Sequence, residues 1–275
     1  MTGFTRTAET FFINGSNGKN LAVTQPYDIY TSGDFNADGI TDMIVHYRAA
    51  NASNGTLKLW TFNGVRRIGS FGFSPSATNV YPAGTGDFDG NGRTDIVLQN
   101  ANNGDFTIWY LGPNGTTGVN TARVATAVLS PQLSSYSAER VVGVTDFNGD
   151  GVPDLLLQDL RTSTSISTRG NVSVLLLNSA SPTSGIVTSL GRRNMLQQIA
   201  DPKLVVRGVD DMNADGLADI VVQMGTVISY FPRFVPAGQT VLDTQTFNFG
   251  TRQSFLREDG TTALTAPSTS WTIRN

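Results

Sequence analysis

One acidic loop occurs four times in this chain, and it constrains the fold more than any other feature. The copies are Asp34–Asp42, Asp87–Asp95, Asp146–Asp154 and Asp211–Asp219. Each follows the pattern D-x-[DN]-x-[DN]-G-x-x-D, with oxygen-bearing side chains at positions 1, 3, 5 and 9 and glycine at position 6. The flanking segments are apolar and rich in β-branched residues, so each loop is predicted to join two strands rather than two helices.

The spacing of the oxygen atoms suits a hard cation. Ca²⁺ takes about 6–8 oxygen ligands, and side chains at positions 1, 3 and 5 can face one centre. Glycine at position 6 permits a turn that a Cβ would hinder. The turn points the backbone carbonyl of position 7 toward the same centre. The aspartate at position 9 completes the cage of oxygen ligands around the cation. An EF-hand would need a glutamate at position 12, where this chain has Val45, Leu98, Leu157 and Val222.

The pattern therefore predicts about four Ca²⁺ ions, one in each loop. The predicted ligands are Asp34, Asn36, Asp38, Ile40 and Asp42; Asp87, Asp89, Asn91, Arg93 and Asp95; Asp146, Asn148, Asp150, Val152 and Asp154; and Asp211, Asn213, Asp215, Leu217 and Asp219. The alternative is a set of metal-free turns, because Asp, Asn and Gly favour turns by themselves. The aspartate at position 9 in all four copies argues against that alternative.

Charge also favours bound cations. Twelve of the 22 acidic residues lie in these loops, three in each, and their carboxylates would repel one another without a counter-ion. The formal net charge is −3, and four Ca²⁺ ions would bring it to about +5. The chain has no cysteine, so disulfides cannot stabilise the fold.

The loops repeat with a long period. Their first aspartates fall at 34, 87, 146 and 211, and each unit contains further apolar β-type segments. A long period of this composition predicts an all-β protein, a β-propeller of four-stranded blades. The single domain 1–275 divides into blades at 28–78, 79–138, 139–202 and 203–249. A fifth blade is predicted from 250–275 together with 1–27, which closes the ring; the alternative is an open ring with frayed ends.

The loops, with an apolar strand after each and an aromatic third strand such as Leu57–Phe62, resemble FG-GAP/VCBS repeats. These repeats form the β-propeller heads of integrin α subunits and occur in many secreted or surface proteins. The resemblance covers Asp34 to about Phe249. It implies that the sixteen side chains at positions 1, 3, 5 and 9 bind calcium, and that ligands bind elsewhere on the propeller.

Catalytic residues are not evident. The single histidine, His46, occupies a position where the other units have Gln99, Gln158 and Gln223. A recurrent polar residue at this place is predicted to bond the neighbouring blade or to cap a strand rather than to catalyse, since buried polar groups seek partners. The alternative is that these four side chains line a ligand pocket.

These observations predict a binding protein rather than an enzyme. We expect an extracellular or cell-surface, calcium-stabilised interaction or adhesion module whose partner is a protein or a glycan. A lectin is the second candidate, and a polysaccharide lyase or hydrolase is the third. The paired arginines at 66–67 and 192–193 are too sparse for nucleic acid, and no apolar run is long enough for membrane insertion. The sequence does not assign an oligomeric state.

Overall fold

The computed structural model describes a large part of the chain. The described residues are 12–14, 20–22, 27–47, 57–73, 80–112, 122–129, 139–160, 170–178, 186–187, 189–194, 203–235, 247–256, 261, 263 and 265. Every regular element in these ranges is a β-strand, which confirms the predicted all-β class. No helix in the described part is long and apolar enough to span a membrane.

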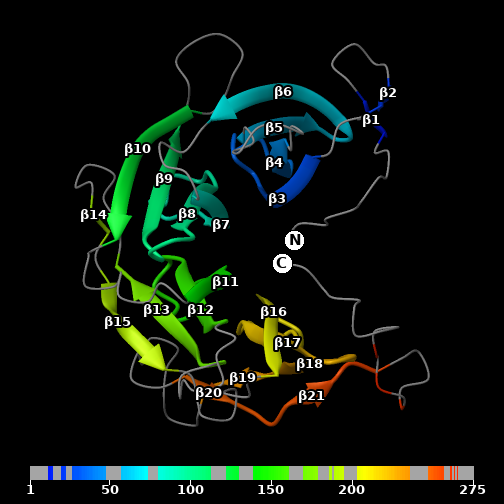
Figure 1. Ribbon diagram of the computed structural model, residues 1–275, viewed down its shortest axis with the longest axis vertical. Helices are drawn as coiled ribbons and strands as arrows, with labels where there is room; N and C mark the ends of the chain where they lie inside the picture. The colour runs from blue at the N-terminus through cyan, green and yellow to red at the C-terminus, as the bar shows by residue number, and fades with distance from the viewer. Residues whose placement is uncertain are drawn as a thin grey trace. The chain divides into compact units, whose positions relative to one another are not determined.

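The strands follow one another along the chain as short segments (Figure 1). They are β1 (Phe12–Asn14), β2 (Asn20–Ala22), β3 (Tyr27–Gly33), β4 (Asp42–Tyr47), β5 (Leu57–Asn63), β6 (Arg66–Phe73), β7 (Val80–Gly86), β8 (Asp95–Asn100), β9 (Phe106–Gly112), β10 (Ala122–Leu129), β11 (Glu139–Thr145), β12 (Asp154–Asp159), β13 (Val172–Leu177), β14 (Ile186–Val187), β15 (Ser189–Asn194), β16 (Leu204–Asp210), β17 (Asp219–Met224), β18 (Val227–Phe231), β19 (Arg233–Phe234), β20 (Asn248–Phe249) and β21 (Gln253–Ser254).

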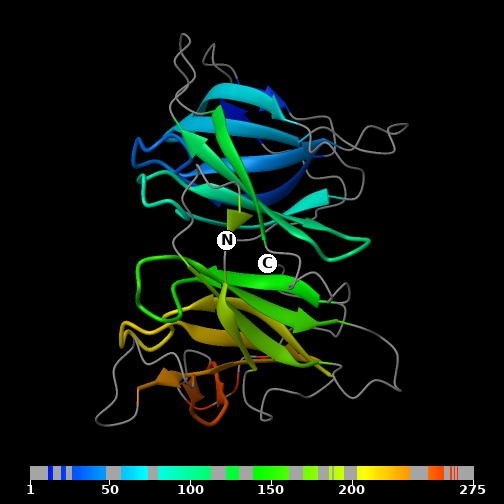
Figure 2. The same cartoon turned by 90° about the vertical axis from the view of Figure 1, so that its left-hand side faces the viewer.

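Four antiparallel sheets of the same topology contain most of these strands. The shared four-strand orders are β3-β4-β5-β6, β7-β8-β9-β10, β11-β12-β13-β15 and β16-β17-β18-β21, and we call the sheets that contain them the first to fourth sheets. β1 and β2 extend the first sheet beyond β6, and β14 extends the second sheet beyond β10. Neighbouring strands within a sheet are twisted relative to one another (Figure 2). In each sheet the acidic loop connects the first strand to the second, so the predicted strand–loop–strand arrangement is confirmed.

Each first strand contains a bulge four residues before its acidic loop. The register shifts at Tyr30, Ala83, Val142 and Arg207, one in each sheet. A bulge bends its strand and increases the local twist. The repeated bulge therefore bends the strand that leads into each loop at the same position. The sequence pattern did not indicate this feature.

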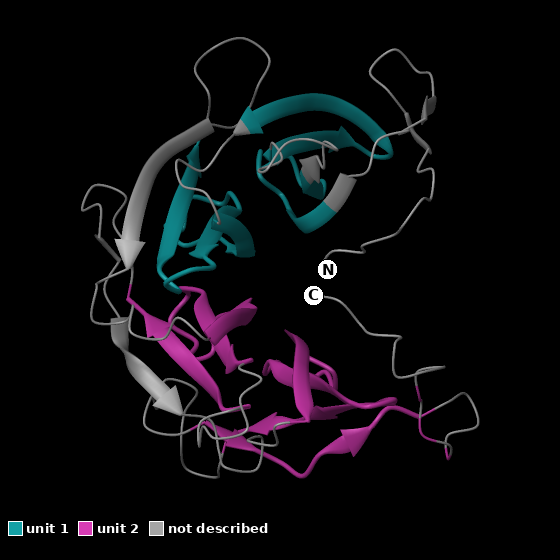
Figure 3. Cartoon of the chain, viewed as in Figure 1, with its two compact units in different colours: residues 1–134, 180–186 teal, residues 135–179, 187–275 magenta. Residues whose placement is uncertain are grey.

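The second and third strands contain most of the buried apolar residues of each sheet. All six side chains of β12 and all six of β13 are buried, which explains why these segments are continuous apolar runs. The chain forms two compact units, each with its own core (Figure 3). The core of unit 1 (1–134 and 180–186) joins the first and second sheets, and the core of unit 2 (135–179 and 187–275) joins the third and fourth.

The end segments add strands at sheet edges. β1 pairs with β2 and, through Asn14 and Arg66, lies parallel to β6 at the edge of the first sheet. β21 pairs with β18 as the outer strand of the fourth sheet. Isolated bridges join Leu256 to Ala263 and Val227 to Thr265. The division into five blades, with one shared by the two termini, stays a prediction.

Candidate metal centres

The four acidic loops have the same backbone conformation. Glycine at position 6 has a positive φ of 80° to 86° in every copy, as the turn prediction requires. Position 4 is also left-handed, with Ala37 at 59°, Gly90 at 72°, Gly149 at 77° and Ala214 at 61°. The small residue at position 4, alanine or glycine in every copy, is the sequence signal for this second left-handed residue.

The first aspartate of each loop organises the turn. Both carboxylate oxygens of Asp34 accept backbone hydrogen bonds, from the N–H of Asp38 at 3.1 Å and the N–H of Gly39 at 2.8 Å. The same two bonds recur at 2.7–3.2 Å in the other loops, with Asp87, Asp146 and Asp211 as acceptors. The carboxylate at position 1 is therefore held toward the interior of the loop by hydrogen bonds that do not depend on a cation.

Positions 3 and 5 form a matched pair of one carboxylate and one amide. The Nδ2 of Asn36 donates to Asp38 at 2.9 Å, and the third and fourth loops repeat this bond. The second loop exchanges the two residues, and Asn91 donates to Asp89 at 3.0 Å. Either order keeps three carboxylates in each loop, which explains why the sequence pattern allows Asp or Asn at both positions.

The aspartate at position 9 is the first residue of the second strand, and it is fully buried in every loop. Asp95 accepts hydrogen bonds from the N–H of Phe88 at 2.9 Å and the N–H of Leu111 at 2.8 Å. Asp154 and Asp219 accept the equivalent pairs at 2.8–3.0 Å, and Asp42 accepts from the N–H of Phe62 at 2.9 Å. This residue thus joins its loop to the third strand or, for Asp219, to β19 just after it, whether or not it also binds a cation.

Burial disfavours the charged form of these closing carboxylates. It raises the pKa of Asp95 and of Asp154 to about 7 from the ordinary 3.8, against the lowering effect of the backbone hydrogen bonds. Neighbouring loop carboxylates raise both values further. The pKa of Asp42 rises to about 6 and that of Asp219 also rises, again mainly through burial.

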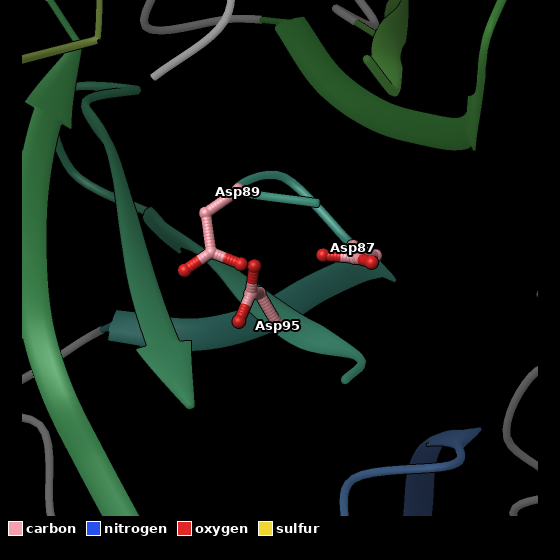
Figure 4. A group of neighbouring side chains, drawn as sticks. All are labelled: Asp87, Asp89 and Asp95. Atoms are coloured by element: carbon pink, nitrogen blue, oxygen red, sulfur yellow. The ribbon is translucent and has the colours of Figure 1, made fainter. Parts of the chain in front are cut away.

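The second loop brings three carboxylates together. Asp87, Asp89 and Asp95 each offer an oxygen, and these atoms lie within 4.8 Å of one another (Figure 4). Burial and the adjacent charge of Asp87 raise the pKa of Asp89. Three close carboxylates, an amide and a backbone carbonyl are the oxygen donors that Ca²⁺ takes. The residues present therefore fit a calcium ion, which would supply the missing positive charge.

A buried aromatic residue at position 2 anchors three of the loops. Phe35, Phe88 and Phe147 are at most 2 % exposed, whereas Met212 of the fourth loop is 38 % exposed. Because the anchor directly follows the first aspartate of the loop, burial of its ring fixes where the loop leaves the sheet. The recurrent Asp-Phe pair in the sequence was the signal for this anchor.

A direct bond connects the first and second loops within unit 1. The N–H of Thr94 donates to the carbonyl of Asp34 at 2.9 Å. The hydroxyl of Thr85 lies 3.3 Å from the carbonyl of Ser32, as a donor, and 3.2 Å from the hydroxyl of Thr31. The first strands of the two sheets therefore pack together beside their loops.

The recurrent glutamine has the predicted structural role in the third sheet. Both polar atoms of the Gln158 side chain bond β16 of the fourth sheet, through the carbonyl of Leu204 and the N–H of Val206, each at 2.9 Å. Gln223 accepts from Arg207 and donates to the carbonyl of Gly225, and Gln99 accepts from the Tyr81 hydroxyl. The His46 side chain lies outside the described residues.

Replacing Ala37 with glycine is expected to stabilise the protein by about 0.5–1 kcal/mol. A left-handed residue with a Cβ costs about 1–2 kcal/mol, whereas glycine gives up about 0.5–1 kcal/mol of chain entropy. Gly90→Ala is the matched reverse change, because Gly90 has the same conformation with open space where a Cβ would stand. Urea unfolding of wild type and both variants tests this. Midpoints equal to that of the wild type in both variants would show that the left-handed residue carries no strain.

The metal-free protein is expected to lose stability as pH rises from about 4 to 8. Asp42, Asp95 and Asp154 have folded pKa values of about 6 to 7, above the 3.8 of the unfolded chain. Their contribution is therefore fully present below pH 3.8 and is lost as pH passes through 6 to 7. With saturating calcium the trend should reverse, because protons compete with the cation. Urea midpoints in metal-free buffers at pH 5 and pH 8 measure this; a midpoint that rises with pH without calcium would contradict it.

Comparison with protein families supports the predicted resemblance. Two segments, 34–98 and 87–157, match the FG-GAP-like repeat. The chain therefore contains FG-GAP-like repeats, and its resemblance to the FG-GAP/VCBS repeat family is confirmed over these residues. The repeats indicate an interaction module of the β-propeller type. A search of curated proteins found no match. The fourth loop lies beyond the matched segments, yet it has the same hydrogen bonds as the other three.

Proposed function

We propose that this protein is an extracellular, calcium-stabilised β-propeller that serves as an interaction module. The observation that carries the proposal is the fourfold repetition of one loop geometry, with three carboxylates in each copy. Each loop holds one Ca²⁺ through positions 1, 3, 5 and 9 and the carbonyl of position 7. About four ions are thus bound in all.

The four sheets act as propeller blades in this proposal. Within each unit, two sheets share an apolar core, as neighbouring blades do. A fifth blade built from both ends of the chain closes the ring and removes exposed sheet edges.

The module binds a protein or a glycan and does not transform it. Calcium sites of this kind fill at extracellular concentrations, which supports secretion or surface display. Connections between strands on a rigid sheet scaffold are suited to recognition. Exposed apolar side chains also occur on the β5–β6 hairpin, where Val65 in the turn is 78 % exposed and Ile68 in β6 is 51 % exposed. Such residues supply contact area for a partner.

A calorimetric calcium titration of the metal-stripped protein tests the metal part of the proposal. We expect saturation at about four ions per chain with dissociation constants below about 10⁻³ M. A titration without heat and without a shift in melting temperature would contradict it.

Two assays separate the partner classes. Calcium-dependent binding on a glycan array would assign a glycan partner, and a protein partner predicts no glycan signal but calcium-dependent association with a surface protein. Release of reducing or unsaturated ends from plant or algal polysaccharides would contradict the non-enzymatic role.

A further inference from the structure

One position beside the loops differs in charge between the repeats. Beside each loop, a backbone N–H donates to the closing aspartate, and the residue that carries it is Phe62, Leu111, Leu177 or Arg233. The first three lie in the third strand of their sheets, and Arg233 begins β19, just after the third strand of the fourth sheet. The first three are buried apolar residues. Arg233 is equally buried, at 4 % exposed, although it carries a guanidinium.

The Arg233 side chain is held in a defined place in unit 2. Its guanidinium lies over the ring of Phe247, 5.0 Å from the ring centre. Phe247 in turn meets Phe147, the anchor of the third loop, edge to face at 5.8 Å. The backbone of Arg233 bonds Asp219 of the fourth loop at 2.8 Å and pairs with Phe249 in the β19–β20 ribbon. The arginine is thus tied to both acidic loops of this unit.

Carboxylates of both loops act electrostatically on Arg233. Burial lowers the pKa of Arg233, while Asp146 and Asp154 of the third loop and Asp215 of the fourth favour its charged form. All three are predicted calcium ligands. A cation that enters either loop is therefore repelled by the positive charge of Arg233. When the loops are empty, the same charge partly balances their carboxylates.

We propose that Arg233 is an internal cation that sets the calcium affinity of the third and fourth loops. It makes these two sites weaker than those of the first and second loops and stabilises them when they are empty. The inference rests on the proposed calcium binding. It divides the sites into two classes, a tight pair in unit 1 and a weak pair in unit 2.

The test compares calcium titrations of wild-type protein, Arg233→Met and Arg252→Met. Arg252 is an exposed arginine near the outer strand of the same sheet, so its replacement removes the same formal charge from the surface. We expect two classes of calcium affinity in the wild type. Arg233→Met should tighten calcium binding at the weaker class by about tenfold, because it removes the Coulomb repulsion between a buried positive charge and the bound ion. Arg252→Met should leave both classes unchanged.

A second measurement does not require bound metal. Arg233→Met should lower the melting temperature of the metal-free protein more than that of the calcium-loaded protein, since only the empty loops need the counter-charge. Arg233→Lys keeps the charge without the planar stacking, and its calcium affinities should stay within about threefold of wild type.

The outcomes distinguish this inference from the proposed function. Absence of calcium binding by the wild type would overturn both. Four sites of equal affinity in the wild type, or equal tightening by Arg233→Lys and Arg233→Met, would overturn the role of Arg233 alone. If Arg233→Met does not fold, the wild-type titration and Arg233→Lys still decide the question.

Discussion

Chelation with EDTA is expected to lower the melting temperature by about 20 °C or more. A site at a calcium concentration 100-fold above its dissociation constant contributes about 2.7 kcal/mol. In a domain of this size, about 1 kcal/mol moves the melting temperature by roughly 2–4 °C. Four sites together therefore give a large shift, because empty loops retain clustered carboxylates such as Asp87, Asp89 and Asp95. Differential scanning calorimetry measures it.

Two controls make the chelation experiment specific. Excess calcium should restore the original melting temperature, whereas equimolar magnesium should restore much less, since Mg²⁺ prefers near-ideal octahedra and retains its waters. A melt that does not change in chelator would show that the loops are hydrogen-bonded turns that need no ion.

Replacing Asp95 with alanine is expected to destabilise the protein by about 3–5 kcal/mol even without calcium. The change leaves the buried N–H groups of Phe88 and Leu111 without their acceptor, at about 1–3 kcal/mol each. With calcium present the loss should be larger, because the same residue closes the second cage. Chemical denaturation in the presence and absence of calcium separates the two contributions.

Three comparison variants calibrate that result. Asp95→Asn can offer an oxygen to only one of the two N–H groups, so it should lose nearly as much as alanine. His46→Ala and Asp105→Ala lie outside the cages and should cost about 1 kcal/mol or less. Equal losses in Asp95→Ala and His46→Ala would show that the closing aspartate has no special structural role.

The parts of the fold that the sequence predicted depend on local chemistry. Glycine at position 6 must turn in a left-handed conformation wherever the next carbonyl has to face the loop centre, and Gly39, Gly92, Gly151 and Gly216 do so. Strands that are buried along their whole length, such as β12 and β13, need apolar side chains on both faces, so their apolar runs predicted them directly. The position of Gln158 in the repeat predicted a bond to the neighbouring sheet, and that bond is present. The bonds of Gln99 to Tyr81 and of Gln223 to Arg207 instead lie within one sheet.

The missed features depend on contacts between segments distant in sequence. The bulge at Tyr30 and its equivalents follows from the pairing of two strands, and no residue type marks it. The two backbone bonds to Asp95 come from positions 7 and 16 residues away, so the motif alone showed only a possible ligand. No residue next to Arg233 in the sequence marks it as buried, because its guanidinium packs on Phe247, 14 residues further along the chain.

The central claim is that the four acidic loops bind calcium, and the metal content of the purified protein tests it most directly. Protein equilibrated with millimolar calcium and then desalted should contain about two or more ions per chain by elemental analysis. A crystal grown in calcium should show an anomalous peak inside each of the four loops. Loops without such peaks, in protein that carries no calcium, would contradict the account.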